Sequence, residues 1–177
     1  MAFLYVYMQM KKMRSCILLF VTFVFIGCFN NEGKKLPDFI ATTLTGKTIK
    51  SGELKGKIVV INIWATWCGS CIAEIPQLNQ LIEKYQYDTS IVFLAITDEA
   101  AEKTQKFLKQ MPLKYNHITD AKELKEIFQP GIRKEIPEHM VIDRDGNIVF
   151  DMSGGSEKTG EILSGKIEEV KKGIAPK

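Results

Sequence analysis

Two cysteines separated by two residues are the part of this sequence best suited to chemistry. The segment Trp-Cys-Gly-Ser-Cys at positions 67–71 lies between a β-branched apolar run and residues spaced as on one face of a helix. A helix N-terminus stabilises an anion through its unpaired N–H groups and its dipole, so Cys68 is expected to be the nucleophile. Cys71, one turn further in, is expected to resolve the mixed disulfide that Cys68 forms with a substrate.

Two other uses of this cysteine pair are weaker. A zinc site would need two further ligands, but the sequence has no second CxxC motif, and its histidines, His117 and His139, each stand alone. A purely structural bridge would close a very short loop and would therefore add little stability. We predict a redox role for the pair, with no metal and no bound cofactor.

The elements around the motif predict an alternating α/β arrangement. A buried central strand is expected over 57–63, followed by a helix over 69–87 that Pro76 should kink. A second buried strand is expected over 91–96. The order of these elements places the cysteine pair between a strand and the first turn of a helix.

Polar residues mark the starts and turns of the later elements. Asp98 is expected to cap a helix that runs to about Lys109. Asp120 and Glu123 form a pattern like a capping box at the start of a helix through Phe128. The remaining predictions are a hairpin over 36–49, a strand over 115–119, a hairpin with strands 140–142 and 148–150 around an Asp-Gly turn, and a helix over 157–170.

The N-terminal segment has the layout of a signal peptide. Three basic residues within positions 11–14 precede an apolar run that ends at Gly27, directly before Cys28. The uncharged stretch 15–31 is shorter than the roughly 20 residues that a membrane-spanning helix needs. Cys16 lies inside the apolar run and would be removed with it. A short anchor that is retained is the alternative.

The last residues of this segment predict a lipid anchor. Phe-Ile-Gly-Cys at positions 25–28 resembles a bacterial lipobox, so Cys28 is expected to be lipidated. We therefore predict a signal peptide of the lipoprotein type over 1–27, a tether over 28–35 and one folded domain over 36–177.

The net charge of +3 does not indicate a nucleic-acid partner. Three of the 24 basic residues precede Cys28, and the other 21 balance the 21 acidic residues. Because the predicted domain is neutral overall, it offers no excess of positive charge to a phosphate backbone.

Several stretches resemble the TlpA/ResA/DsbE-like thioredoxins, which are membrane-tethered oxidoreductases that work outside the cytoplasm. The matching residues are Leu36-Pro37-Asp38-Phe39, the run from Gly56 to Cys68, then Cys71, Glu74 and Pro76, and finally Ile136-Pro137 and the run from Ile142 to Gly146. The resemblance implies a thioredoxin fold over 36–177, an α/β fold whose mixed central sheet is flanked by helices. It also implies an N-terminal hairpin and a strand-helix insertion over 115–128.

The resemblance further implies an enzyme that reduces disulfides in exported proteins, with apocytochrome c among the candidate substrates. Its electrons would come from a membrane thiol carrier, and it would need no cofactor. The protein would lie in the bacterial cell envelope, outside the cytoplasm, held to the membrane by lipid on Cys28. The same cysteines would also serve an oxidase or an isomerase, because the direction of exchange depends on the redox potentials of the pair and its partners.

The resemblance assigns roles to residues outside the cysteine pair. Pro137 resembles the family's cis-proline, whose loop with Ile136 faces the disulfide and binds an extended substrate chain; a trans turn proline is the alternative. Asn62 stands where cytoplasmic thioredoxins bury an aspartate that acts on the second cysteine. Glu74, three residues after that cysteine on the same helix face, is the expected substitute base. Trp67 is expected both to pack and to contact substrates.

Two related classes of protein are weaker alternatives. Sco-type copper-binding assembly proteins use two cysteines and a histidine, but their cysteines are spaced CxxxC, and His139 is a poor third ligand. A peroxidase of the peroxiredoxin type would need the pattern Pro-x-x-x-Thr-x-x-Cys before its reactive cysteine, and this sequence lacks that pattern. Thiol-disulfide exchange therefore explains the cysteine pair better than copper binding or peroxide reduction.

Overall fold

The computed structural model of the protein describes residues 34–131 and 135–173. The predicted signal peptide, the lipidation site Cys28 and most of the tether lie outside these ranges. In the described part of the chain, no helix combines the length and the apolar character needed to cross a membrane.

A mixed five-stranded sheet forms the centre of the described residues. Its strands follow the order β5 (Asn116–Ile118), β4 (Ile91–Ile96), β3 (Ile58–Ile63), β6 (Glu138–Ile142) and β7 (Ile148–Ser153). Strand β3 is parallel to β4, and β4 is parallel to β5, whereas β6 is antiparallel to both of its neighbours. Every residue of β3 is buried, as expected for an apolar strand that is covered on both faces. The predicted α/β fold with a mixed sheet is confirmed.

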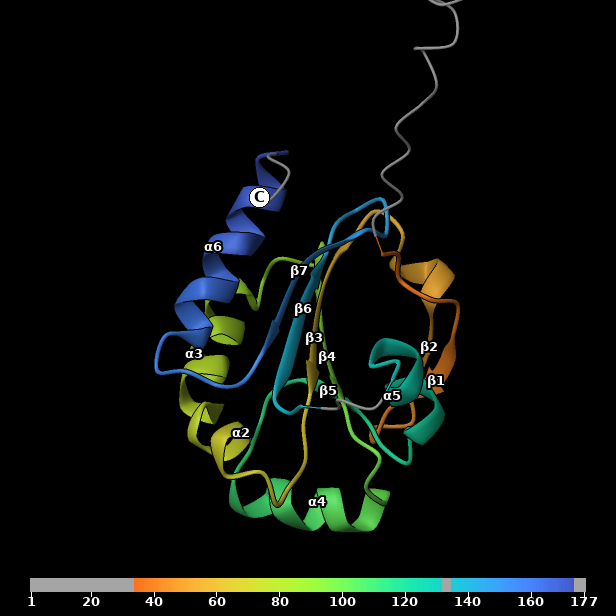
Figure 1. The fold of residues 1–177 in the computed structure, drawn as a ribbon, viewed down its shortest axis with the longest axis vertical. Coiled ribbons are helices and arrows are strands. Elements are labelled where there is room, and N and C mark those ends of the chain that lie inside the picture. The colour runs from red at the N-terminus through yellow and green to blue at the C-terminus, as the bar shows by residue number, and fades with distance from the viewer. Residues whose placement is uncertain (1–33, 132–134, 174–177) are drawn as a thin grey trace, which may run out of the picture. The chain divides into compact units, whose positions relative to one another are not determined.

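Helices α3 (Ile75–Tyr85) and α6 (Thr159–Lys171) cover one face of the sheet and lie side by side (Figure 1). The short helix α2 (Gly69–Ala73) directly precedes α3 at the end of the sheet where β3 ends. Leu78 of α3 and Leu163 of α6 are fully buried in the apolar core of this face. Packing on these leucines therefore holds α3, and α2 with it, against the sheet.

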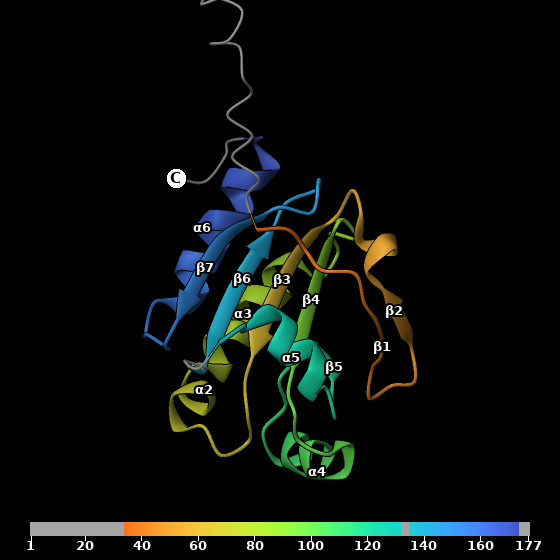
Figure 2. The same cartoon turned by 45° about the vertical axis from the view of Figure 1, so that its right-hand side comes forward.

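The opposite face of the sheet is covered by α5 (Lys122–Phe128) (Figure 2). Phe128 of this helix packs in a second apolar cluster that includes Ile61 of β3. Helix α4 (Ala101–Gln110) lies at the end of the sheet near α2 (Figure 1). Together β5 and α5 form the strand-helix insertion that the sequence predicts.

The predicted N-terminal hairpin is present beside the sheet. Strands β1 (Ile40–Thr42) and β2 (Thr48–Lys50) pair antiparallel, and a 3-10 turn over Ser51–Leu54 follows them. Gly46 in the connecting turn has a φ of 82°, a left-handed conformation that glycine adopts at low cost. The two strands form a separate sheet. Thr43, the residue after β1, makes a bridge to Ile118 of β5, and Ile49 of β2 packs in the same apolar cluster as Ile61.

The predicted kink near Pro76 is a complete break in the helix. Helix α2 ends at Ala73 and α3 begins at Ile75, with Glu74 between them. Proline has no N–H to donate and fits best in the first turn of a helix, where α3 places it. The break gives α2 and α3 their own ends and puts Glu74 at the junction.

The two predicted helix caps are wrong in detail. Helix α4 begins at Ala101 rather than directly after Asp98, whose carboxylate accepts a hydrogen bond from Lys125 Nζ at 3.0 Å. Asp120 does not cap α5, which has no side-chain cap. Its Oδ2 instead accepts a hydrogen bond from the N–H of Ala101 at 3.0 Å. Asp120 therefore stabilises the N-terminus of α4, which is distant in sequence, because the segment after β5 folds back beside that helix end.

Candidate active site

The cysteine pair lies where β3 is followed by α2. Cys68 and Cys71 are joined by a disulfide with an S–S distance of 2.07 Å. Cys68 is the N-cap residue of α2, and its Sγ accepts a hydrogen bond from the backbone N–H of Cys71 at 3.2 Å. The N-terminal N–H groups of a helix stabilise negative charge, so this geometry favours a thiolate at Cys68 when the bridge is reduced.

The surroundings of the two sulfur atoms differ. Both cysteines are buried in the apolar core, but Cys68 is 5% exposed and its Sγ is 3.4 Å from the hydroxyl oxygen of Ser70, whereas Cys71 is only 1% exposed. A substrate would therefore meet the sulfur of Cys68 before that of Cys71.

The loop before β6 faces the disulfide. The peptide bond between Ile136 and Pro137 is cis, as the resemblance implies. The carbonyl oxygen of Ile136 lies 3.8 Å from Cys68 Sγ. The carbonyl oxygen of Pro137 accepts a hydrogen bond from the N–H of Gly154 at 2.7 Å, which ties the loop to the segment after β7. Residues from distant parts of the chain thus form one wall beside the cysteine pair.

The two tryptophans near the motif have different environments. Trp64 is buried and packs against Phe107 of α4 and against His117, with ring centroids 5.6 Å apart in both pairs. Trp67 is 68% exposed, next to Cys68. Trp64 therefore belongs to the core, and the indole of Trp67 is free to contact another molecule.

Glu74 is buried, although it is a carboxylic acid at a helix junction. Its side chain is only 1% exposed, and its Oε1 lies 2.9 Å from Nε2 of His139 on β6. Its Oε2 points toward Gly155 in the loop after β7. A Cβ added to Gly155 would lie 3.0 Å from this oxygen and 3.3 Å from Pro137 Cγ. The carboxyl group therefore lies between His139 and the cis-proline loop.

Further polar groups surround this glutamate on the same face of the sheet as Cys71. His139 pairs with Asn62 across β6 and β3. We call the following residues the buried polar cluster: Asn62, Glu74, Tyr115 and His139. In the described part of the chain, several polar atoms of this cluster have no hydrogen-bond partner of good geometry: Asn62 Oδ1, both carboxyl oxygens of Glu74, the Tyr115 hydroxyl and both ring nitrogens of His139.

The buried environment of Tyr115 changes the pKa of its phenol. Burial, and secondly the charge of Glu74, raise its pKa far above the ordinary value of 10. Tyr115 therefore remains a neutral O–H donor at every physiological pH. The pKa of the other buried histidine, His117, is lowered by burial, although its ring is 2.8 Å from the carbonyl oxygen of Leu113.

His139 lies beside Glu74 at the candidate site, a contact that the sequence analysis does not predict. The sequence carries only a weak signal of this role, because His139 is a polar residue within a strand that is otherwise mostly apolar. Its partner Glu74 is distant in sequence, so local patterns do not join the two. Within residues 34–131 and 135–173, no three His, Cys, Asp or Glu side chains are grouped so that they could hold a metal ion.

Glu138 follows the cis-proline and is a second buried acid near the site. Burial, as the main cause, and the neighbouring Asp151 raise its pKa from 4.5 to about 7, although a hydrogen bond from Gln129 acts in the opposite direction. Lys34, Phe128, Ser153 and other residues line a hollow of about 360 Å³ beside it. The charge of Glu138 thus changes near neutral pH.

Glu138→Gln should stabilise the protein above pH 7. Because the pKa of Glu138 is raised in the folded state, the protonated side chain favours folding. This stabilisation is fully present below pH 4.5 and is lost as the pH rises through 7. Glutamine carries no charge, so we expect a gain of roughly 1 kcal/mol in the free energy of unfolding at pH 8 and little change at pH 4. Urea unfolding of Glu138→Gln at both values measures this, with the exposed Glu135→Gln as control. An equal gain at pH 4 and pH 8 would contradict the assignment.

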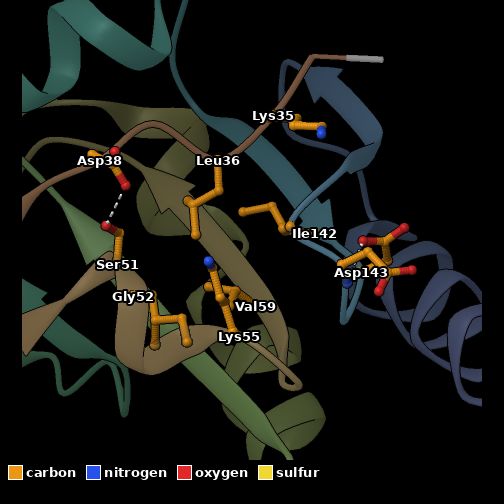
Figure 3. Close-up of a pocket in the computed structure, with 12 residues that line it drawn as sticks. Lys35, Leu36, Asp38, Ser51, Gly52, Lys55, Val59, Ile142 and Asp143 are labelled. Carbon is orange, nitrogen blue, oxygen red and sulfur yellow. Dashed lines mark hydrogen bonds between the residues drawn. The ribbon is translucent and has the colours of Figure 1, made fainter. Parts of the chain in front are cut away.

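A separate pocket lies at the other end of the central strands (Figure 3). It has a volume of about 210 Å³ and is lined by Val59 of β3 and Ile142 of β6, among others. Asp38 and Ser51 at its rim are joined by a hydrogen bond of 3.3 Å from the hydroxyl to the carboxylate. Because Cys68 follows the opposite end of β3, this pocket is not part of the redox site.

A central sheet of this order, with a bridged CxxC pair at the start of the helix after β3, defines the class of thioredoxin-fold thiol-disulfide oxidoreductases. The chain belongs to the AhpC/TSA family, whose model matches residues 33–151. It is also 36% identical over 138 residues to a thiol-disulfide oxidoreductase ResA of Bacillus cereus, and this match covers 78% of each chain. The protein is therefore a thiol-disulfide oxidoreductase.

Solved structures agree with this class. The fold is similar to that of a thiol:disulfide interchange protein of the thioredoxin family from Chlorobium tepidum, with a TM-score of 0.65 and 28% identity over 76% of this chain and 95% of that one. StoA from Bacillus subtilis has the same fold, with a TM-score of 0.61 and 22% identity over 73% of this chain and 95% of that one.

Proposed function

We propose that the protein reduces disulfides in exported proteins, with Cys68 as the nucleophile and Cys71 as the resolving thiol. The observation that carries this proposal is the placement of Cys68 at the N-cap of α2, beside the carbonyl of Ile136 and ahead of the more deeply buried Cys71. The name of the Bacillus cereus relative, a thiol-disulfide oxidoreductase, supports the exchange chemistry.

The reaction transfers two electrons from the dithiol to a substrate disulfide. The Cys68 thiolate attacks one substrate sulfur, the substrate S–S bond breaks, and the other substrate sulfur leaves as a thiolate that takes up a proton. Cys71 then loses its proton and attacks Cys68 Sγ. This step breaks the mixed disulfide, releases the second substrate thiol and forms the Cys68–Cys71 bridge that the structure contains.

Glu74 is proposed as the base that accepts the proton of Cys71. A thiol shielded from water resists ionisation, because burial disfavours the charged form. Glu74 follows Cys71 by three residues, and both side chains are almost completely buried. The negative charge of the carboxylate would also oppose the formation of two thiolates close together.

The substrate chain is proposed to bind across Trp67 and the cis-proline loop. The exposed indole of Trp67, next to Cys68 in the chain, offers apolar area, and the loop of Ile136 and Pro137 lies beside Cys68 Sγ. Together these surfaces would hold an extended segment with its sulfur over Cys68 Sγ. Oxidised apocytochrome c, whose haem-attachment motif is CxxCH, is a candidate substrate with the required pair of sulfurs.

A reductase must transfer electrons toward its substrate. We expect the reduced protein to convert one equivalent of an oxidised CxxCH peptide to the dithiol, and the midpoint potential of the Cys68–Cys71 couple to be lower than that of the peptide. Mass spectrometry of the alkylated products measures the exchange. If the oxidised protein instead oxidises the reduced peptide nearly completely, the protein is an oxidase and the proposed direction is wrong.

We propose that the protein works outside the cytoplasm, anchored to a bacterial membrane by lipid on Cys28 after cleavage of residues 1–27, with a membrane thiol carrier as its electron donor. The sequence layout supports this proposal. Cys28→Ser should abolish lipidation and leave the precursor uncut or release the protein from the membrane. Detergent partitioning and the mass of the N-terminus test this. Membrane retention of the variant at the mature size would exclude the lipid anchor.

A further inference from the structure

His139 and Glu74 are two ionisable side chains in contact inside the protein. His139 is 0% exposed and Glu74 is 1% exposed, and the atoms Nε2 and Oε1 lie 2.9 Å apart. Among the described residues, no lysine or arginine forms an ion pair with Glu74. His139 is therefore the cationic partner available to this carboxylate.

The buried position limits the charge that the two side chains can carry. A lone carboxylate away from water is strongly disfavoured, whereas a carboxylate next to a protonated imidazole is neutral as a pair. With one shared proton, Glu74 can remain a carboxylate in the interior while His139 holds the proton. Without the histidine, Glu74 would have to take up that proton itself.

The remaining groups around the pair do not replace His139 in this role. Tyr115, from the segment before β5, stays neutral, because burial and the charge of Glu74 raise its pKa. Asn62 on β3 and Met152 on β7 are the register partners of His139 and carry no charge. The two cysteines at the start of α2 carry no charge while they are bridged, and reduction can only add negative charge there. Glu157, from the loop before α6, is exposed and also acidic.

We propose that His139 is a positioning residue for the reaction, which keeps Glu74 ionised so that Glu74 can accept the proton of Cys71. This inference rests on the proposed function of the cysteine pair and of Glu74. The Cys71 proton moves to Glu74, the Cys71 thiolate attacks Cys68 Sγ, and the departing substrate thiolate takes up a proton. The Glu74–His139 pair then returns to its state with one proton, so charge and protons balance over the turnover.

The test compares His139→Gln with the parent protein in single-turnover reduction of an oxidised CxxCH peptide from pH 5 to 9. We expect the acid limb of the pH–rate profile to move to higher pH by about one unit, which lowers the rate about tenfold at pH values on that limb. At pH 9 the rate should approach that of the parent. His117→Gln removes a buried histidine that does not contact Glu74, and it should leave the profile in place.

Two further variants separate this inference from the proposed function. Glu74→Gln should be slow at every pH, and the double variant with His139→Gln should be no slower, because His139 acts through Glu74. If Glu74→Gln is as fast as the parent, the proposed role of Glu74 fails. If Glu74→Gln is slow but His139→Gln lowers the rate equally at all pH values, only the role of His139 fails.

A measurement on the parent protein keeps the proposal testable if His139→Gln does not fold. The carbon-13 shift of the Glu74 carboxyl and the nitrogen-15 shifts of the His139 ring can be followed together between pH 4 and 9. We expect both to change in common steps, as coupled groups do. Independent titrations, or an imidazole that is neutral wherever the carboxyl is ionised, would overturn the proposal.

Discussion

Cys71→Ala is expected to accumulate mixed disulfides with its substrates and to lose turnover almost completely. The Cys68 thiolate, stabilised by the N-terminus of α2, can still attack a substrate disulfide in this variant. The resulting mixed disulfide then has no internal thiol to resolve it, so it persists. Trapping in intact cells, followed by non-reducing electrophoresis and mass spectrometry, would identify both the adducts and the sulfur that carries them.

The matched variant, Cys68→Ala, should trap almost nothing. Its remaining thiol, Cys71, is 1% exposed in the apolar core and cannot meet a protein substrate without a rearrangement of α2. Equal trapping by Cys68→Ala and Cys71→Ala would show that the assignment of nucleophile and resolving thiol is wrong.

Glu74→Gln has the second largest expected effect. The substitution keeps the shape of the side chain and removes its basicity and charge, so we expect turnover to fall roughly 10²-fold near pH 7, the usual scale for a lost general base. The titration of the two cysteines should shift as well, because they are coupled to the carboxylate. Reduction of a model disulfide across pH 5 to 9, with thermal unfolding to confirm folding, measures both effects.

Glu157→Gln is the control for this experiment. Glu157 lines the same hollow as Glu74, but its side chain is exposed, so its removal changes the local charge without removing a buried base. We expect this variant to retain the parent rate. If Glu74→Gln also retains the parent rate over the whole pH range, Glu74 does not take part in the chemistry.

The buried polar cluster has a cost for folding. Polar atoms without hydrogen bonds in the interior are destabilising, and an apolar core would normally fill the same volume. The cluster lies on the sheet face that holds Cys71, which is the thiol that must lose a proton away from water. Destabilising features of this kind are concentrated at functional sites in natural proteins. The proposed proton transfer from Cys71 would explain why buried polar groups are present here.

The amino-acid sequence by itself determined the parts of the protein that depend on neighbours along the chain. The apolar run over 57–63 predicts the central strand, and the CxxC motif directly after it predicts the redox pair at a helix start. Pro76 predicts a kink where the structure has a break between α2 and α3. Each of these follows from local rules, namely side-chain periodicity and the missing N–H of proline.

Tertiary structure alone decided which distant residues meet. The contact between Glu74 and His139 depends on the packing of the α2–α3 junction over β6 and on the register that sets His139 opposite Asn62. In the same way, Asp120 stabilises the start of α4 and not that of α5. Strand register and helix packing are set by burial over the whole domain. A local pattern can therefore identify a side chain that is able to form a hydrogen bond or an ion pair. It cannot identify the distant residue that folding places next to that side chain.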